Sequence, residues 1–302
     1  APNEARMQFA EVTGSRTLPR GRLAFAGLIL LYAALVVVCL GAFVMAGDLS
    51  LGRNPWSNLV KSLGDFARPS FVDLWFGPER LEYRSDDGTL LRVENRRLVE
   101  ADFLAALVRA SWVTFQIATL GSLLAAVMAL PLGILTARNL HAPRPLAYAA
   151  KAVLDATRAI HTLVFGLVLV GIVGLGPTAG ILAIALHSMG TYGKLFAESI
   201  ETLDMGSVDA VRATGASSTQ VFFSAVWPSV LPQFISSHLY VWEFNIRDST
   251  ILGLIGAGGL GLLISEAVSL FQWGRLATVL LVVVAMVTAF DAVSRRIRKA
   301  LL

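Results

Sequence analysis

The sequence predicts an all-α integral membrane protein with six transmembrane helices and both termini in the cytoplasm. Three observations support this fold class. Hydrophobic residues make up 55% of the 302 positions and charged residues only 15%. The apolar runs are long and separated by short polar segments, and basic residues gather at the flanks of the runs. A soluble domain of this length would have to bury too many such runs.

The first predicted span covers residues 23–47, after a cytoplasmic N-terminal arm, residues 1–22. It contains no acidic or basic side chain and is long enough to cross about 30 Å of hydrocarbon. Val44 and Ala46 resemble a signal-peptidase site, so removal of this segment is the alternative, but the apolar run is too long for an ordinary signal peptide. Cys39 has no partner cysteine in the sequence, which excludes a disulfide framework.

Five further spans follow the same apolar pattern. They are expected at about Ser111–Thr136, Ala156–Leu175, Thr178–Phe196, Phe234–Ile255 and Arg275–Val293. The N-terminal arm, the link 138–151 and the tail 295–299 are rich in arginine and lysine, so the positive-inside rule places all three in the cytoplasm. The net charge of +4 is explained largely by these flanks and does not call for a nucleic-acid partner.

Two longer polar segments separate the spans. Residues 48–102 are expected outside the membrane, with a possible β-hairpin around a turn at Asp87 and Gly88 or, alternatively, an irregular loop. Residues 103–302 are expected to form the membrane core, with short cytoplasmic helices at about 198–228.

The local sequence of that cytoplasmic segment predicts two helices and a tight joint. Ser207 is expected to cap a helix that Gly215 ends in a left-handed conformation. Ser217 and Gln220 have the spacing of a capping box for the next helix. Pro228 and Pro232 are expected to stop that helix before the fifth span. Such a segment is either an ordinary loop or a docking element for a soluble partner.

The run DAVRATGASSTQVFFSAVWP resembles the EAA motif of bacterial ABC importer permeases. Asp209, Ala210, Val211, Gly215 and Pro228 occupy motif positions. Two positions depart from the motif, because Ala225 and Trp227 replace its aliphatic residue and its leucine. The resemblance assigns ATPase coupling to Asp209, Ala210, Val211, Arg212, Gly215 and Ala216.

The runs GLGPTAG, KLFAESIE, RATGA and YVWEFNIRDSTILGLIGAGGLG together resemble the permease of the phosphonate importer family, over roughly Ser111–Leu302. Leu260 replaces the usual isoleucine, and Leu81–Arg97 has no clear family counterpart. The resemblance implies a type I ABC importer permease fold in a bacterial cytoplasmic membrane. It also implies a homodimeric pore, two cytoplasmic ATPase subunits and an extracytoplasmic phosphonate-binding protein.

The chain itself is expected to bind no cofactor and to catalyse no reaction. It contains no GxxxxGK[ST] phosphate loop, so ATP and Mg²⁺ would be bound by the partner ATPase. The four histidines, His141, His161, His187 and His238, have no metal-site or catalytic spacing. The alternatives are a permease of the same architecture for another small substrate such as phosphate, and a secondary transporter, although no internal repeat is evident.

The run GAGGLG matches the dinucleotide fingerprint G-x-G-x-x-G. That fingerprint applies only between a strand and a helix of a βαβ unit, whereas this run follows a predicted membrane span. A glycine-rich turn or gate at the outer mouth is therefore the better interpretation, with Gly256, Gly258, Gly259 and Gly261 allowing the chain to bend.

Polar residues of the fifth span fall on one helical stripe: Ser236, Tyr240, Glu243, Arg247 and Thr250. Glu243 precedes Arg247 by four residues, the favourable order for an ion pair on a helix. An isolated charge within the bilayer costs on the order of 3 kcal/mol or more, so the pair is expected to face protein or water.

Two accounts of the pair remain open. It either locks the fifth span against its neighbours, or it presents Arg247 to a passing phosphorus oxyanion. Arg158, His161 and His187 could extend such a cationic translocation pathway, or could be ordinary structural residues. Asn245, Asp248 and His238 lie on another side of the helix and are expected to bond to adjacent spans.

Overall fold

The computed structural model describes residues 20–46, 55–76, 80–84, 90–140 and 143–301. The chain divides into two compact units, residues 1–60 and 61–302. The first unit contains helix α1, Arg20–Ala46, which confirms the first predicted helix. Because α1 is apolar all round beyond Arg22, it is suited to hydrocarbon rather than to water.

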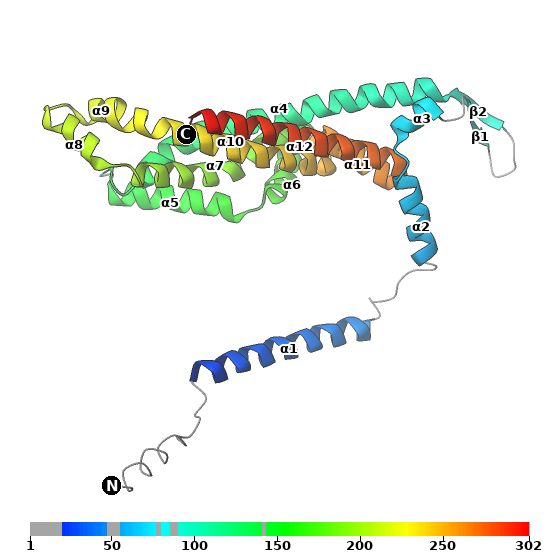
Figure 1. Ribbon diagram of the computed structural model, residues 1–302, viewed down its shortest axis with the longest axis horizontal. Coiled ribbons are helices and arrows are strands. Elements are labelled where there is room, and N and C mark those ends of the chain that lie inside the picture. The colour runs from blue at the N-terminus through cyan, green and yellow to red at the C-terminus, as the bar shows by residue number, and fades with distance from the viewer. Residues whose placement is uncertain (1–19, 47–54, 77–79, 85–89, 141–142, 302) are drawn as a thin grey trace, which may run out of the picture. The chain divides into compact units, whose positions relative to one another are not determined.

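The second unit is a helical bundle with a small β-hairpin (Figure 1). Its long helices are α4 (Arg96–Thr136), α5 (Arg144–Ala159), α6 (Thr162–Val173), α7 (Pro177–Glu201), α10 (Trp227–Leu252) and α12 (Trp273–Leu301). Its short helices are α3 (Ser70–Phe76), α8 (Met205–Ala213), α9 (Ser218–Val221) and α11 (Leu260–Ser269), and α2 (Pro55–Phe66) crosses the boundary between the units. Two π-helical turns, η1 (Phe222–Val226) and η2 (Gly253–Ala257), flank α10.

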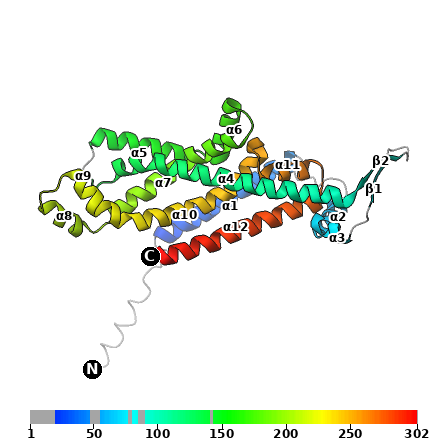
Figure 2. The ribbon, with the colours of Figure 1, turned by 90° about the horizontal axis from the view of Figure 1, so that it is seen from above.

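Helix α7 forms the centre of this bundle and packs against α4, α5, α6 and α10 (Figures 1 and 2). Small residues let the backbones approach closely. A Cβ atom on Gly133 would lie 3.0 Å from the carbonyl oxygen of Gly193, and one on Gly121 would lie 2.8 Å from Ile184 Cβ. Close packing of small residues is the usual way in which helices associate in a membrane, where lipid provides no hydrophobic driving force.

The β-hairpin and the short helices α8 and α9 lie at opposite ends of this bundle in both views (Figures 1 and 2). Strands β1 (Arg80–Arg84) and β2 (Leu90–Asn95) are antiparallel, with Leu81 opposite Glu94. The predicted hairpin is therefore confirmed, while its expected turn at Asp87 and Gly88 lies outside the described residues.

Helix α4 begins at Arg96, fifteen residues before the expected start of the second span at Ser111. Asn95 caps it by accepting a hydrogen bond from the backbone N–H of Arg97 at 3.0 Å. The prediction was wrong because the charges of residues 96–102 suggested a loop. Phe103, Leu104 and Leu107 nevertheless share one face at helical spacing and pack against Leu260 and Val279.

The third predicted span, residues 156–175, is not one straight helix. Helices α5 and α6 meet at a 92° bend after Ala159. Side chains satisfy backbone groups that the break leaves unpaired: His161 Nδ1 accepts from the N–H of Leu163, and His187 Nδ1 lies 2.8 Å from the carbonyl oxygen of Ile160. The predicted span joined the last turn of the amphipathic α5 to the apolar α6, because a hydropathy pattern contains no information about a bend between them.

Three described helices are long and apolar enough to cross a membrane by themselves: α1, α4 and α12. The number rises to five if two bent pairs each form one span, namely α5 with α6, and the α9–η2 segment with α11. Helix α7 is not among these candidate spans, and its buried residues include glycine, serine and tyrosine. The mostly helical membrane fold is confirmed, and six crossings with both termini inside remain a prediction.

Gly190→Ala should weaken the contact between α7 and α5. The added Cβ would lie 2.8 Å from the backbone nitrogen of Arg158 and 2.7 Å from Thr157 Oγ1, so one helix must shift. We expect a loss of about 1–3 kcal/mol, seen as a lower midpoint of thermal aggregation in detergent. Gly171→Ala in α6 is the matched control, since its Cβ would meet nothing within 4 Å. Equal midpoints for both variants would contradict this packing.

Candidate translocation pathway and coupling segment

A buried polar network connects α10 to two other helices. The side chain of Asn245 donates to Ser122 Oγ of α4 at 2.7 Å and accepts from Ser188 Oγ of α7 at 2.8 Å. All three residues are buried. Because a polar group buried in an apolar bundle is costly unless it is paired, this network fixes the relative positions of α4, α7 and α10.

Two further contacts hold α10 in the bundle. Thr162 Oγ1 of α6 donates to Asp248 Oδ2 at 2.8 Å, and Tyr192 of α7 donates its hydroxyl to the carbonyl oxygen of His238 at 3.3 Å. The ring of His238 also stacks on Tyr192. The prediction that these side chains bond to adjacent helices is confirmed for Asn245 and Asp248, whereas the bond of His238 is made by its backbone oxygen and its Nδ1 has no hydrogen-bond partner among the described residues.

Glu243 is buried and lies between two arginines. Arg247 Nη2 is 2.8 Å from Glu243 Oε1, which confirms the predicted ion pair on α10. Arg298 of α12 approaches the other carboxylate oxygen at 4.0 Å. Sequence reasoning missed Arg298, because no periodicity relates residues 55 positions apart. Glu243 therefore links α10 to α12 as well as holding Arg247.

The predicted polar stripe of α10 divides into an exposed edge and a buried edge. With 3.6 residues per turn, Tyr240 and Arg247 lie along one edge, and both are exposed. Glu243 and Thr250 lie along the other edge, and both are buried. Arg247 stacks over the ring of Phe244, with its Cζ atom 5.2 Å from the ring centroid. The stripe is thus not a uniform lining: its exposed edge alone is open to a ligand or another subunit.

A cleft of about 220 Å³ lies between α7 and α10. Its polar and aromatic lining residues are His187, Ser188, Thr191, Tyr240, Phe244, Asn245 and Asp248. Tyr240 and His187 were predicted from the sequence, and the ring of His161 lies 6.2 Å from that of His187. Ser188 and Thr191 were missed, although their positions one and four residues after His187 place them near its face of α7. The lining can hydrogen-bond a small polar solute.

Arg158 does not line this cleft. It lies in the last turn of α5, pairs with Asp155 at 3.1 Å, and lines a separate cleft between α5 and α7. The cationic side chains that the sequence suggested for one pathway are therefore distributed over two places in the bundle.

Helix α8, in the EAA-like segment, begins earlier than expected. Asp204 caps it, with Oδ1 accepting from the N–H of Gly206 at 3.0 Å, while Ser207 Oγ donates to the carbonyl oxygen of Asp204. The predicted cap at Ser207 was wrong because both side chains are good caps and the acid stands three residues earlier. Gly215 has φ +83°, and Ser217 and Gln220 form the predicted capping box, so both predictions are confirmed.

The EAA-like segment has one anchored face and one exposed face. Val208 is fully buried and packs in a cluster with Val221 and Val226. Asp209, Ala210 and Arg212 are exposed, with Asp209 and Arg212 3.0 Å apart. The anchored face holds α8 on the bundle, and the exposed face is available to a partner.

The chain continues as one helical rod from α9 into α10. The prediction that Pro228 and Pro232 stop the helix was wrong, because the π-helical turn η1 precedes Pro228 and Pro228 lies in the first turn of α10. Pro228 lacks an N–H for the preceding turn, and the helix passes it where the hydrogen-bond pattern changes from the π-helical turn to α10. Pro232 lies inside α10 and costs one backbone hydrogen bond without ending the helix.

The glycine-rich run after α10 is a sharp turn, as predicted. Gly256, Gly258 and Gly259 all have positive φ, and α11 is bent by 59° from the preceding helical segment. Gly256 accepts a hydrogen bond from the N–H of Gly176, and the N–H of Leu260 donates to Thr114 Oγ1 at 2.8 Å. The turn is therefore bound to both α4 and the loop before α7. Whether it gates a pathway stays a prediction.

These features define a helical membrane permease, with a polar cleft within its bundle and an exposed helical segment at one end. Residues 129–302 match the family model described as "Binding-protein-dependent transport system inner membrane component". The chain belongs to this family, and the resemblance to a phosphonate-type permease is confirmed.

Three relatives show the extent of the similarity. The "Putative phosphite transport system permease protein HtxC" of Stutzerimonas stutzeri is 42% identical over 66% of this chain and 71% of its own length. The "Phosphite transport system permease protein PtxC" of the same organism is 43% identical over 63% and 70%. The "Phosphate-import permease protein PhnE" of Mycolicibacterium smegmatis is 35% identical over 62% of this chain and 35% of its own length.

A solved structure has the same fold. An inward-facing conformation of the MetNI methionine ABC transporter aligns with a TM-score of 0.61 and 22% identity, covering 67% of this chain and 98% of that one. The type I ABC permease architecture is therefore confirmed, while this similarity says nothing about the substrate.

Glu243→Ala should destabilise the bundle more than Arg247→Ala. Removing the buried carboxylate leaves Arg298, whose side chain is only 24% exposed, without this partner, at a cost of about 1–3 kcal/mol. Removing Arg247, whose side chain is 47% exposed, leaves Glu243 still facing Arg298 and should cost less than about 1 kcal/mol. Thermal midpoints in detergent compare the variants. An equal or larger loss for Arg247→Ala would contradict the role given to Arg298.

Proposed function

We propose that this chain is the membrane-spanning permease subunit of an ATP-driven importer for phosphonates and closely related phosphorus oxyanions. The observation that carries the proposal is the 42–43% identity to two phosphite permeases over about two thirds of the chain. Similar relatives named for phosphonate and phosphate transport support the same substrate class.

The cleft between α7 and α10 is the part of the chain that we assign to the substrate. Phe244 lines the cleft, and the guanidinium of Arg247, which does not itself line the cleft, lies over the Phe244 ring. Planar N–H donors match an oxyanion in bidentate geometry. Glu243 holds Arg247 and competes with the anion for it, which favours the weak binding that passage requires. Thr250 is buried, and its hydroxyl donates to the carbonyl oxygen of Ile246. We therefore assign it no contact with the substrate.

The exposed face of the EAA-like segment is the surface that we assign to the ATPase. Asp209, Ala210 and Arg212 project from α8, while Val211 and Ala216 pack against the core cluster. Movement of a partner against the exposed face of α8 would pass to α9 and η1, which α8 contacts, and then to α10, because α9, η1 and α10 form one continuous rod. ATP and Mg²⁺ belong to that partner, and the permease cycles between inward-open and outward-open states.

The complete importer in this proposal contains a second permease subunit, two ATPase subunits and an extracytoplasmic binding protein. A copy of this chain is the second subunit that we expect. The exposed edge of α10, with Tyr240, Phe244 and Arg247, faces the shared pathway in such a dimer. The α8 end of the bundle is then cytoplasmic and the hairpin end is outside, in a bacterial cytoplasmic membrane (Figure 1).

The proposal predicts that phosphorus oxyanions stimulate ATP hydrolysis by the reconstituted importer. Proteoliposomes with the permease, its ATPase and its binding protein would receive methylphosphonate, phosphite, phosphate, methionine or no ligand. We expect stimulation by at least one phosphorus oxyanion that requires all three proteins, and none by methionine. If phosphorus oxyanions change neither ATP hydrolysis nor uptake, the proposed substrate class is wrong. If uptake proceeds without ATP, the chain is not part of an ATP-driven importer.

Arg247→Ala in the same proteoliposomes tests the assignment of the cleft. We expect uptake to fall about tenfold or more with assembly retained, because the loss of one charge-assisted hydrogen-bonding group is worth about 1.5–3 kcal/mol. Arg247→Lys, which keeps the charge but not the planar fork, should fall between wild type and Arg247→Ala. Unchanged uptake in Arg247→Ala would remove Arg247 from the pathway.

Gly215→Val should weaken coupling to the ATPase. Its Cβ would meet nothing within 4 Å, so the cost is the left-handed backbone at φ +83°, about 1–2 kcal/mol for an ordinary residue and more for a β-branched one. We expect lower ATPase co-purification and lower ligand-stimulated hydrolysis. Gly215→Asn is the control, since asparagine tolerates this conformation and should retain both. Equal activity of the two variants would show that this joint does not set coupling.

A further inference from the structure

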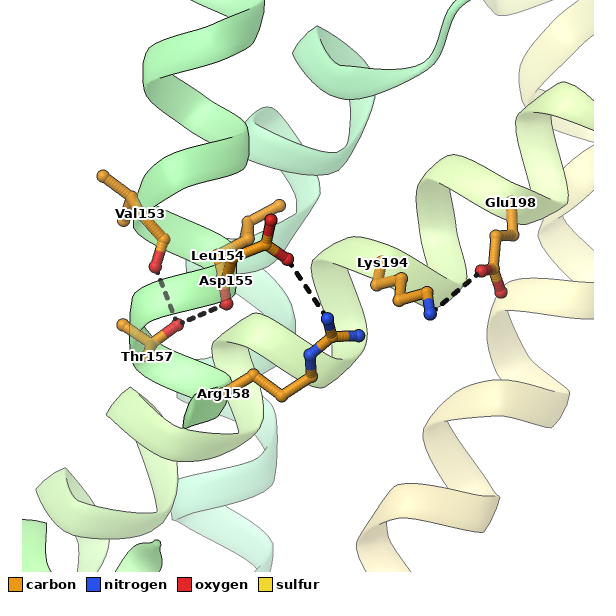
Figure 3. A network of polar contacts seen from close by, with 7 residues as sticks. All are labelled: Val153, Leu154, Asp155, Thr157, Arg158, Lys194 and Glu198. Carbon is orange, nitrogen blue, oxygen red and sulfur yellow. Dashed lines mark hydrogen bonds and ion pairs between the residues drawn. The ribbon is translucent and has the colours of Figure 1, made fainter. Parts of the chain in front are cut away.

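A charged cleft of about 350 Å³ lies between α5, α7 and the end of α4, at the α8 end of the bundle. Its polar and charged lining residues are Thr136, Arg138, Lys151, Asp155, Arg158, Lys194, Glu198 and Glu201. Figure 3 shows Arg158 of α5 and Lys194 of α7, each paired with an acid of its own helix. The cleft is separate from the one between α7 and α10.

Most of the basic side chains in this cleft have an acidic partner. Arg158 pairs with Asp155 at 3.1 Å, and Lys194 pairs with Glu198 at 3.5 Å. Glu201 accepts from the backbone N–H of Arg138 at 3.0 Å and lies 3.9 Å from its guanidinium. These side chains are 33–85% exposed, and exposed pairs contribute little, so an anionic ligand can replace the acids.

Lys151 differs from the other cations of the cleft. It is exposed and has no ion-pair partner in the part of the chain that the structure describes. It also lines a second cleft of about 530 Å³, which shares Thr136 and Arg138 with the first. That second cleft adds Arg144 and Tyr148, and none of the described residues that line it is acidic. Among the described residues, the two clefts together present four basic and three acidic side chains around Lys151.

The helices that carry these charges are held rigidly. Leu154 of α5 is buried, and the glycines of α7 let its backbone approach: Cβ atoms on Gly190 and Gly193 would meet Leu154. Asn139 donates to the carbonyl oxygen of Ile200 at 2.6 Å, which ties the end of α4 to the end of α7. The basic side chains therefore project from fixed backbones into a preformed space, as a binding site requires.

We propose that this double cleft binds a phosphate-type oxyanion, with Lys151 as its central contact and Arg138, Arg144, Arg158 and Lys194 around it. Arginine offers paired donors to phosphate oxygens, and lysine supplies a compact charge. Such an oxyanion is either the headgroup of an anionic lipid or a free phosphorus oxyanion. The location of the site on the cytoplasmic side rests on the proposed function, whereas the binding chemistry does not.

The test measures binding to the full chain alone, without ATPase or ATP, so its result is independent of transport. In nanodiscs of phosphatidylcholine, radiolabelled inorganic phosphate would be titrated and saturable binding measured. In a second arm, nanodiscs of phosphatidylcholine with phosphatidylglycerol would be analysed by native mass spectrometry for retained anionic lipid. The variants are Lys151→Ala, Lys151→Arg and the control Arg296→Ala/Lys299→Ala, which removes two exposed charges from the end of α12.

We expect Lys151→Ala to weaken binding about fivefold or more, Lys151→Arg to restore it, and the control to retain it, with equal thermal midpoints throughout. This pattern in the phosphate arm identifies a free oxyanion as the ligand, and the same pattern only in the lipid arm identifies the headgroup. The proposal is overturned if neither arm shows saturable binding, or if the control loses as much as Lys151→Ala. Equal losses would show that the ligand is attracted by the basic residues at the membrane flank in general, and not by a site at Lys151.

Discussion

The close approach of α7 to its neighbours is the constraint on which the rest of the bundle depends. Glycine at positions 133, 190 and 193 brings the backbones of α4 and α5 against α7, where larger residues would clash. Because lipid tails are as apolar as leucine, burial of apolar surface gives little driving force inside a bilayer. Close packing and buried hydrogen bonds must therefore supply the driving force for helix association. Asn245 of α10 provides two such bonds, one to Ser122 of α4 and one to Ser188 of α7.

The same constraint produces the cleft assigned to the substrate. Small residues draw α7 against α4 and α5, whereas His187, Thr191, Tyr240 and Phe244 prevent α7 and α10 from closing along their whole length. The polar groups in the cleft serve two purposes, since Asn245 and Asp248 hold helices together while they line the space. Because structural hydrogen bonds line the cleft, its shape can change only when the helices move, which agrees with the proposed coupling through α8.

Two breaks in the helices, the bend between α5 and α6 and the turn before α11, are held by hydrogen bonds to neighbouring segments. At the bend between α5 and α6, His161 and His187 satisfy exposed backbone groups. At the turn before α11, Thr114 accepts a hydrogen bond from the N–H of Leu260, and the N–H of Gly176 donates to the carbonyl oxygen of Gly256. Irregular backbone within a membrane protein is tolerated only where protein or water meets its hydrogen bonds. Each break is therefore fixed to another helix, and movement of one element is transmitted to the next.

The sequence by itself determined the membrane class, the approximate positions of most helices, the hairpin, the Gly215 joint, the glycine turn and the Glu243–Arg247 pair. All of these depend on periodicity or on neighbours within a few residues. Only the tertiary structure decided the early start of α4, the bend after Ala159, the role of Arg298 and the separation of Arg158 from His187 and Tyr240, which line another cleft. These features depend on contacts between distant segments, which local patterns cannot contain.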